Sequence, residues 1–205
     1  MQPTEVCQIV DPSWLARPSV EVAPALVGCT LVRQFPDGQT FRGLIVETEA
    51  YAPNDPACHA YRRRTPRNQV MFGPAGFTYV YLIYGIYYCL NIVTDLDDVP
   101  SAVLIRALQL ESLPASVAQT KATPFNRIAA GPGKLCQVMQ IDLSLTAQAL
   151  CPGQPLWLEH RSCQFQQDLD SQNATLVQTT RIGLSQGTDL PWRWYLNNCP
   201  AVSKR

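Results

Sequence analysis

The stretch that limits the possible folds most strongly is residues 78–94, which carry no charged side chain and five of the eight tyrosines. Aromatic and β-branched residues favour strands. The stretch is broken at Tyr84-Gly85, where glycine lets the backbone turn sharply. The pattern therefore predicts two strands joined near Tyr84-Gly85 and, with them, a β-sheet core.

Further elements are predicted on both sides of this pair. Pro36-Asp37-Gly38 is a strong turn signal and predicts a hairpin between strands over residues 29–35 and 40–51. Other strands are predicted over residues 102–108, 156–160, 174–182 and 192–196. Short helices are predicted over residues 19–28 and after Gly131-Pro132-Gly133, and loops over residues 52–77, 112–130 and 161–173.

These elements favour a mixed α/β (α+β) fold, with a single domain around a curved antiparallel β-sheet and short flanking helices. The length of 205 residues suits one domain. We expect residues 1–17 to form an irregular N-terminal lead-in and residues 18–205 to form the domain.

Composition excludes several classes of protein. Hydrophobic residues make up 46% of the chain and charged residues 16%, well below the roughly 25% of a typical globular chain, which excludes general disorder. No apolar run of about 18 residues occurs, so no membrane span is predicted. The N-terminus has no apolar run and is not expected to be a secretory signal, which favours a cytoplasmic location.

The eight cysteines are expected to be mostly reduced core residues of a cytoplasmic protein. They form no C-x-x-C pair, and His59 and His160 are the only histidines, so a zinc site is not expected.

Charge is distributed unevenly, although the net charge is zero. Residues 51–94 carry four arginines, at positions 62, 63, 64 and 67, and a single carboxylate, Asp55. Such a patch can meet phosphate groups. A short run of charge is also typical of a soluble loop, so both interpretations stay open here.

Residues 40–51 carry a candidate site. Side chains alternate between the two faces of a strand, so Glu47, Glu49 and Tyr51 project together just before a loop with Asp55 and His59. The pattern fits a solvated strand face, and it also fits a metal-dependent nuclease that holds a divalent ion with the carboxylates and His59. The tyrosines between residues 79 and 88 fit either core packing or a stacking platform with a wedge for nucleic acid.

Several motifs occur in a fixed order along the chain. They are Glu47-Thr48-Glu49-Ala50-Tyr51, Asp55-Pro56-Ala57-Cys58-His59, Thr65-Pro66-Arg67-Asn68, Tyr79-Val80-Tyr81-Leu82-Ile83-Tyr84-Gly85, Leu104-Ile105-Arg106, Gly131-Pro132-Gly133-Lys134 and Arg181-Ile182-Gly183. Together they resemble the alkyladenine (3-methyladenine) DNA glycosylase family, in its bacterial form, over roughly residues 18–200. Cys58 and Arg63 depart from the pattern, which more often has a small residue and glycine there.

The resemblance implies a role for each matched residue. Glu49 would be the catalytic carboxylate, which activates water for attack on the sugar. The residues implied to line the pocket for the base are Tyr51, His59, Tyr81 and Asn91. The residues implied to contact DNA are Tyr84, as a wedge in the minor groove, together with Arg106, Arg62, Arg67 and Lys134.

The function implied is that of a monofunctional DNA glycosylase of base excision repair. It would flip 3-methyladenine, 7-methylguanine, hypoxanthine or etheno-adenine out of duplex DNA and hydrolyse the N-glycosidic bond, leaving an abasic site. No metal and no organic cofactor is expected, because water is the nucleophile. The expected partner is double-stranded DNA with damaged purines, bound by a monomer in the cytoplasm, at the nucleoid if the source is bacterial.

Two alternatives remain at this stage. One is the metal-dependent nuclease, with Glu47, Glu49, Asp55 and His59 around the ion. The other is a noncatalytic binder of damaged DNA that keeps the tyrosine wedge.

Overall fold

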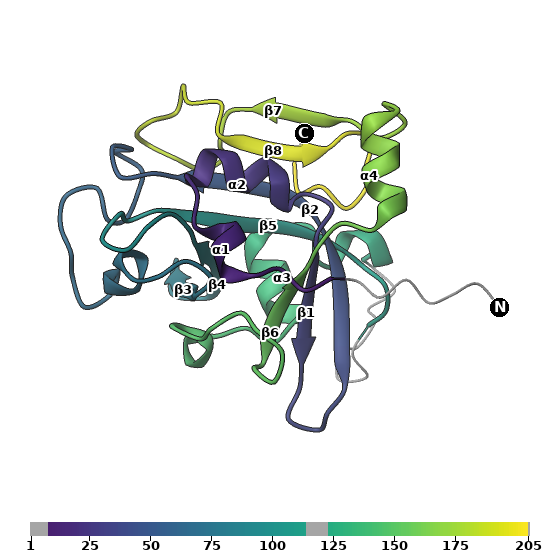
Figure 1. The fold of residues 1–205 in the computed structure, drawn as a ribbon, viewed down its shortest axis with the longest axis horizontal. Helices are drawn as coiled ribbons and strands as arrows, with labels where there is room; N and C mark the ends of the chain where they lie inside the picture. Colours follow the sequence, from purple (N-terminus) through teal and green to yellow (C-terminus); the bar gives the residue numbers. More distant parts are fainter. Residues whose placement is uncertain (1–7, 114–122, 205) are drawn as a thin grey trace.

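The computed structural model describes residues 8–113 and 123–204. Its strands form one antiparallel sheet of eight strands in the order β3-β4-β5-β2-β1-β6, with β8 paired to β2 and β7 paired to β8. The strands are β1 (Thr30–Gln34), β2 (Thr40–Tyr51), β3 (Thr78–Ile83), β4 (Tyr87–Val93), β5 (Ala102–Leu110), β6 (Leu156–Glu159), β7 (Leu176–Thr179) and β8 (Arg193–Leu196). Figure 1 shows this curled sheet with β7 and β8 along one side.

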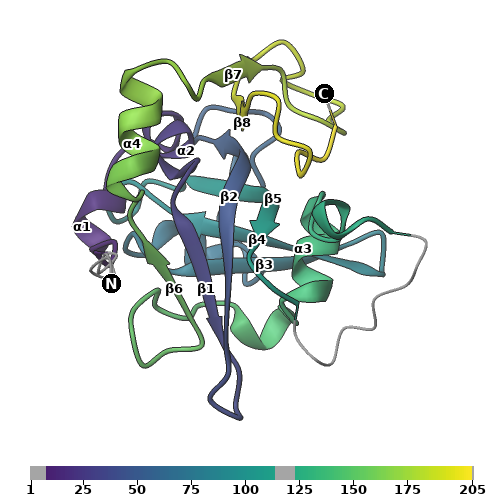
Figure 2. The same cartoon turned by 90° about the vertical axis from the view of Figure 1, so that its right-hand side faces the viewer.

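Short helices surround the sheet. They are α1 (Pro12–Leu15), α2 (Ser19–Leu26), α3 (Pro132–Val138) and α4 (Cys163–Asp170), with 3-10 turns η1 (Gln69–Phe72), η2 (Phe125–Arg127) and η3 (Leu143–Leu145). Helix α2 packs against β2, and α3 packs against β4 and β5 (Figure 2). The predicted fold class, a single mixed α/β domain around a curved antiparallel sheet, is confirmed.

Strand β2 changes partner along its length, and this change positions the candidate site. Its first half pairs with β1, whereas Glu47, Thr48 and Glu49 pair with β8. Opposite β5, the register shifts between Ile45 and Thr48, which is the signature of a β-bulge. A bulge bends a strand and re-aims its side chains, and this one places Glu47 and Glu49 between β5 and β8.

The hairpin predicted within residues 78–94 is confirmed as β3 and β4, and the predicted strand over residues 40–51 is confirmed as β2. The hairpin turn consists of Tyr84 and Gly85, whose φ angles are 54° and 71°. Two central residues with positive φ define a type I′ turn, which matches the twist of the paired strands. Tyrosine rarely adopts this conformation, so the backbone at Tyr84 is strained.

The prediction of a loop over residues 161–173 is wrong, because residues 163–170 form α4. The side chain of Ser162 caps this helix by accepting a hydrogen bond from the backbone N–H of Phe165 at 3.1 Å. Side-chain hydrogen bonds one turn apart, from Gln164 to Asp168 at 3.0 Å and from Gln166 to Asp170 at 2.8 Å, support it. The helix is largely polar, and the apolar periodicity on which the prediction depended is therefore missing.

Smaller differences occur elsewhere. Helix α1, capped by Asp11, lies in the segment predicted to be an irregular lead-in, of which residues 1–7 lie outside the described residues. Of the loop predicted over 112–130, residues 114–122 also lie outside them, and η2 follows. In the part of the chain that the structure describes, no helix is long and apolar enough to cross a membrane. As predicted, most described cysteines are buried: Cys29, Cys58, Cys89, Cys136 and Cys199.

Substitution of Gly28 by alanine should destabilise the fold more than substitution of Gly38. Both glycines have positive φ, at 92° and 83°, so alanine costs about 1–2 kcal/mol in backbone strain at either position. At Gly28 a Cβ would also lie 2.0 Å from the ring of Phe165, whereas at Gly38 it would meet nothing within 4 Å. Overpacking should add about 1–3 kcal/mol to the loss at Gly28. Urea unfolding of both variants measures the difference, and equal losses would contradict the packing of α4 against Gly28.

Candidate active site

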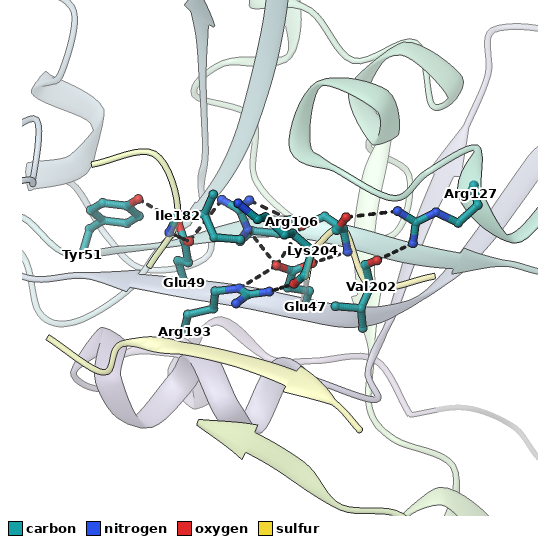
Figure 3. Close-up of polar contacts among 10 residues, drawn as sticks. Glu47, Glu49, Tyr51, Arg106, Arg127, Ile182, Arg193, Val202 and Lys204 are labelled. Atoms are coloured by element: carbon teal, nitrogen blue, oxygen red, sulfur yellow. Dashed lines mark hydrogen bonds and ion pairs between the residues drawn. The ribbon is translucent and has the colours of Figure 1, made fainter. Parts of the chain in front are cut away.

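Two buried carboxylates on β2 share one guanidinium group. Glu47 and Glu49 have no solvent-accessible side-chain surface. Arg106, on the adjacent strand β5, places its Nε 2.9 Å from Oε1 of Glu47 and its Nη1 3.1 Å from Oε1 of Glu49. Figure 3 shows Arg106 between the two, with Glu49 towards Tyr51 and Ile182 and Glu47 towards Val202 and Lys204. The predicted projection of both carboxylates to one side of β2 is therefore confirmed.

Glu47 is surrounded by donors. Besides Arg106, its carboxylate accepts from Nε of Arg193 at 2.7 Å, from the backbone N–H of Ser203 at 2.7 Å and from the Ser203 hydroxyl at 2.9 Å. Burial acts to raise the pKa of Glu47, but Arg106, Ser203 and Arg193 together outweigh it and hold the pKa below its ordinary value. Glu47 is thus a fully paired anion.

Glu49 has a different set of partners. Its Oε2 accepts from the Tyr51 hydroxyl at 2.8 Å, and its Oε1 accepts from the backbone N–H of Ile182 at 2.8 Å. Tyr51, Ile182 and Arg106 all line a cleft of about 380 Å³. Arg193 and Ser203, which hold Glu47, are not among the described residues that line it. All three described residues that bind Glu49 therefore line the cleft, whereas Arg106 is the only described partner of Glu47 that does.

The cleft brings together predicted site residues from distant parts of the chain. Tyr51 ends β2, Tyr81 lies on β3, Tyr84 forms the hairpin turn, Arg106 lies on β5, and Lys134 lies in the first turn of α3. Tyr84 is 80% exposed and projects at the edge of the cleft. The motifs that are separated in sequence thus converge on one cavity.

A smaller cavity adjoins the cleft and contains the other predicted pocket residues. It is lined in part by Tyr51, His59, Tyr81 and Asn91, and its volume of about 20 Å³ is enough for about one water molecule. Tyr51 and Tyr81 line both cavities. All four residues predicted to line a base pocket therefore do lie around one small cavity.

The walls of this small cavity are held by specific contacts. His59 Nδ1 and the Tyr79 hydroxyl share a hydrogen bond of 2.9 Å, and the His59 ring lies edge-on to Tyr81 with centroids 4.5 Å apart. Burial of the ring and the positive charge of Arg67 lower the pKa of His59 below its ordinary value. The Asn91 amide donates to the carbonyl of Tyr79 at 3.0 Å.

The two arginines of the loop that were singled out from the sequence lie in different places. Arg62 lines a neighbouring groove of about 470 Å³ between residues 56–65 and residues 183–186, which shares His59 with the small cavity and Gly183 with the cleft. The guanidinium of Arg67 instead lies 5.5 Å from the ring centroid of Tyr81. Both side chains are exposed.

An ion pair behind Tyr51 was not predicted. Arg181 and Asp55 form a bidentate pair, with Nη2 of Arg181 2.8 Å from Oδ1 of Asp55, and the guanidinium lies 4.7 Å from the ring centroid of Tyr51. Because Ile182 follows Arg181 directly, this pair also holds the N–H that binds Glu49. The motif Arg181-Ile182-Gly183 was the one available signal. Nothing in residue spacing pointed to Arg193 or Ser203, which only the fold brings to Glu47.

Comparison with known proteins agrees with this arrangement. Residues 13–200 match the family model described as methylpurine-DNA glycosylase. The chain belongs to the methylpurine-DNA glycosylase family. It is 59% identical over 202 residues to the protein named "Putative 3-methyladenine DNA glycosylase" of Trichodesmium erythraeum (strain IMS101). The aligned residues cover 96% of this chain and 98% of that protein. A protein of the same name from Synechococcus sp. (strain JA-3-3Ab) is 54% identical over 197 residues, covering 93% and 96%.

The chain is accordingly a DNA glycosylase, a hydrolase of N-glycosyl bonds that acts in DNA repair.

The residues that would hold the metal ion in the alternative nuclease are not arranged as metal ligands in this glycosylase. Glu47 and Asp55 are each engaged by guanidinium groups, and His59 is engaged by Tyr79. Within residues 8–113 and 123–204, no three His, Cys, Asp or Glu side chains cluster as metal ligands.

In this glycosylase, Glu47→Gln should destabilise the fold by about 3–5 kcal/mol, because it leaves the buried charges of Arg106 and Arg193 without their main counter-charge. Glu49→Gln, which removes contact with one arginine, serves as the matched comparison and should cost less. Chemical denaturation at neutral pH measures both. A loss at Glu47 no larger than that at Glu49 would contradict the assigned charge pairing.

Glu47→Gln should also change how the stability of the fold responds to acid. Since the folded pKa of Glu47 lies below its ordinary value of 4.5, its stabilising contribution is complete above about pH 4.5 and is lost as pH falls through the folded pKa. Thermal unfolding from about pH 7 down to about pH 3 should therefore show a shallower decline of Tm for Glu47→Gln than for wild type. Parallel declines would show that another carboxylate governs acid stability.

Proposed function

We propose that this glycosylase excises alkylated or deaminated purines from duplex DNA by means of a water molecule activated by Glu49. The substrate class comprises 3-methyladenine, 7-methylguanine, hypoxanthine and etheno-adenine, and the product is an abasic site. The observation that carries the proposal is that Glu49 is a buried carboxylate whose three hydrogen-bond partners all line the cleft. The names of the relatives support 3-methyladenine as one substrate.

The chemistry follows from the surroundings of Glu49. Tyr51, Ile182 and Arg106 hold the carboxylate in one orientation. A water in the cleft beside it would give its proton to Glu49 while its oxygen attacks C1′ of the deoxyribose. The negative charge of Glu49 would also stabilise the positive charge that develops on the sugar as the bond to the base breaks.

The base must leave the duplex to reach this water. Tyr51, His59, Tyr81 and Asn91 are the proposed walls for the flipped base. Aromatic rings suit damaged purines, since rings stack on bases and attract cationic ones. The cavity between these residues is about 20 Å³, so we expect their side chains to move apart when a base enters.

The DNA backbone would be bound around the cleft. Tyr84 would enter the minor groove and fill the space left by the flipped nucleotide. Lys134, Arg62 and Arg67 are exposed and offer positive charge to phosphates. Arg106 would reach the phosphate of the flipped nucleotide from the cleft wall, while its Nε and Nη1 stay on the two carboxylates.

Glu49→Gln should lower base release on the order of 10²–10⁴-fold while DNA binding is kept, because the amide is not a general base. Release of free base from methylated duplex DNA is measured in EDTA under single-turnover conditions, and binding is measured by gel shift. Glu111→Gln makes the same change at an exposed position directly after β5 and should leave release unaltered. Unchanged release by Glu49→Gln would contradict the role of Glu49 as the general base, and an absence of release by wild type despite binding would favour the noncatalytic binder.

Tyr84→Ala should impair excision from duplex DNA more than excision from a single strand, since a wedge has a gap to fill only in a duplex. A fluorescent base opposite or beside the lesion would report a smaller flipped population in the variant. Leu96→Ala, which truncates another exposed apolar side chain outside the hairpin, is the matched control. Equal losses on both kinds of DNA would argue against the wedge.

A further inference from the structure

Arg67 differs from the other arginines of its loop, because it lies against the proposed base pocket. Its guanidinium is 5.5 Å from the ring centroid of Tyr81, and its charge contributes to the lowered pKa of His59. Arg64 is instead paired with Asp98 and stacked on Phe72, and Arg62 lines the neighbouring groove. Among the carboxylates of residues 8–113 and 123–204, none lies within ion-pairing distance of Arg67.

We propose that Arg67 is a specificity-determining residue that biases the pocket towards neutral purine lesions and against cationic ones. The inference rests on the proposed function, since it concerns the base that this pocket receives. Neutral lesions here are hypoxanthine and etheno-adenine, and cationic lesions are the nucleotides of 3-methyladenine and 7-methylguanine.

The first reason is direct repulsion between like charges. A cationic base placed against Tyr81 would approach a guanidinium that already lies near the same ring. His59, whose ring lies edge-on to Tyr81, is an imidazole and supplies no negative charge to compensate. A neutral purine meets no such repulsion.

The second reason is that the ring of Tyr81 is already in contact with a cation. The attraction of a cation to an aromatic ring depends on the electron density of its face. A first cation polarises that density towards itself, so a second cation gains less. Tyr51 is in the same situation, because Arg181 lies 4.7 Å from its ring centroid. Both tyrosines of the proposed pocket thus have a guanidinium beside them.

The reaction indicates that Arg67 discriminates between lesions when the base enters the pocket, and not when the bond breaks. The bond between C1′ and the purine nitrogen breaks with its electron pair on the base, the water oxygen bonds to C1′, and Glu49 takes the water proton. A neutral base then leaves as an anion, and a cationic base leaves as a neutral molecule. The charge of the base changes by the same amount in both cases, so Arg67 assists bond breaking about equally. Its discrimination acts on kcat/KM, through the charge of the base that enters.

The test is a competition in which one enzyme sample receives two labelled duplexes, one with 7-methylguanine and one with hypoxanthine. The ratio of released bases gives the ratio of the two kcat/KM values. Arg67→Gln should raise the ratio of 7-methylguanine to hypoxanthine about threefold to tenfold, the range expected for a partly screened charge at this distance. Arg67→Lys keeps the positive charge on which the repulsion depends and should keep the ratio within about twofold of wild type.

Arg62→Gln is the matched control, since it removes the same charge from the same loop away from Tyr81. It should weaken both reactions alike and leave the ratio unaltered. An unchanged ratio in Arg67→Gln, or an equal change in Arg62→Gln, would overturn the assignment to Arg67. Failure of wild type to release either base would instead overturn the proposed function, so the two failures can be told apart.

Discussion

The arrangement of the whole site depends on charge compensation inside the sheet. Glu47 and Glu49 have no solvent-accessible side-chain surface, and Arg106 and Arg193 supply the positive charge that buried carboxylates require. The bulge in β2 brings both carboxylates between β5 and β8, which are the strands that carry these two arginines. The strand pairing of β2 with β5 and β8 therefore also determines which arginines reach the two carboxylates.

The two carboxylates differ in their pairing, which fits the two tasks that the proposed mechanism requires. Glu47 takes the larger share of the guanidinium groups and has its remaining lone pairs filled by Ser203. Glu49 is consequently left with lighter pairing and with partners that face the cleft. A single carboxylate would have to balance the arginines and also accept a proton, and these requirements conflict, because strong pairing weakens a base.

Local patterns in the sequence predicted what depends on near neighbours. The alternation along residues 40–51, the turn at Pro36-Asp37-Gly38 and the break at Tyr84-Gly85 each predicted the right element. The helix over residues 163–170 was missed because its stability comes from a cap and from side-chain pairs rather than from an apolar face.

The candidate site was predicted in part. Alternation alone placed Glu47 and Glu49 together but could not distinguish their roles, and the choice of Glu49 depended on family resemblance. The distinction comes from Arg193, Ser203 and Ile182, which lie more than 130 residues away along the chain. No spacing rule connects residues so far apart, since their proximity arises only when β8 joins the sheet and the following segment folds back.

That returning segment has a consequence for the order of events during biosynthesis. Arg127 holds the carbonyls of Pro200, Val202 and Ser203, Arg193 donates to the carbonyl of Lys204, and Ser203 in turn completes the shell around Glu47 (Figure 3). A chain emerging from the ribosome presents β2 and β5 before residues 193–204. Until then the buried cluster contains Glu47, Glu49 and Arg106 without Arg193, an excess of one negative charge. The complete site therefore forms only after residues 193–204 have been made, and partial chains that lack them should remain inactive however well their first strands pair.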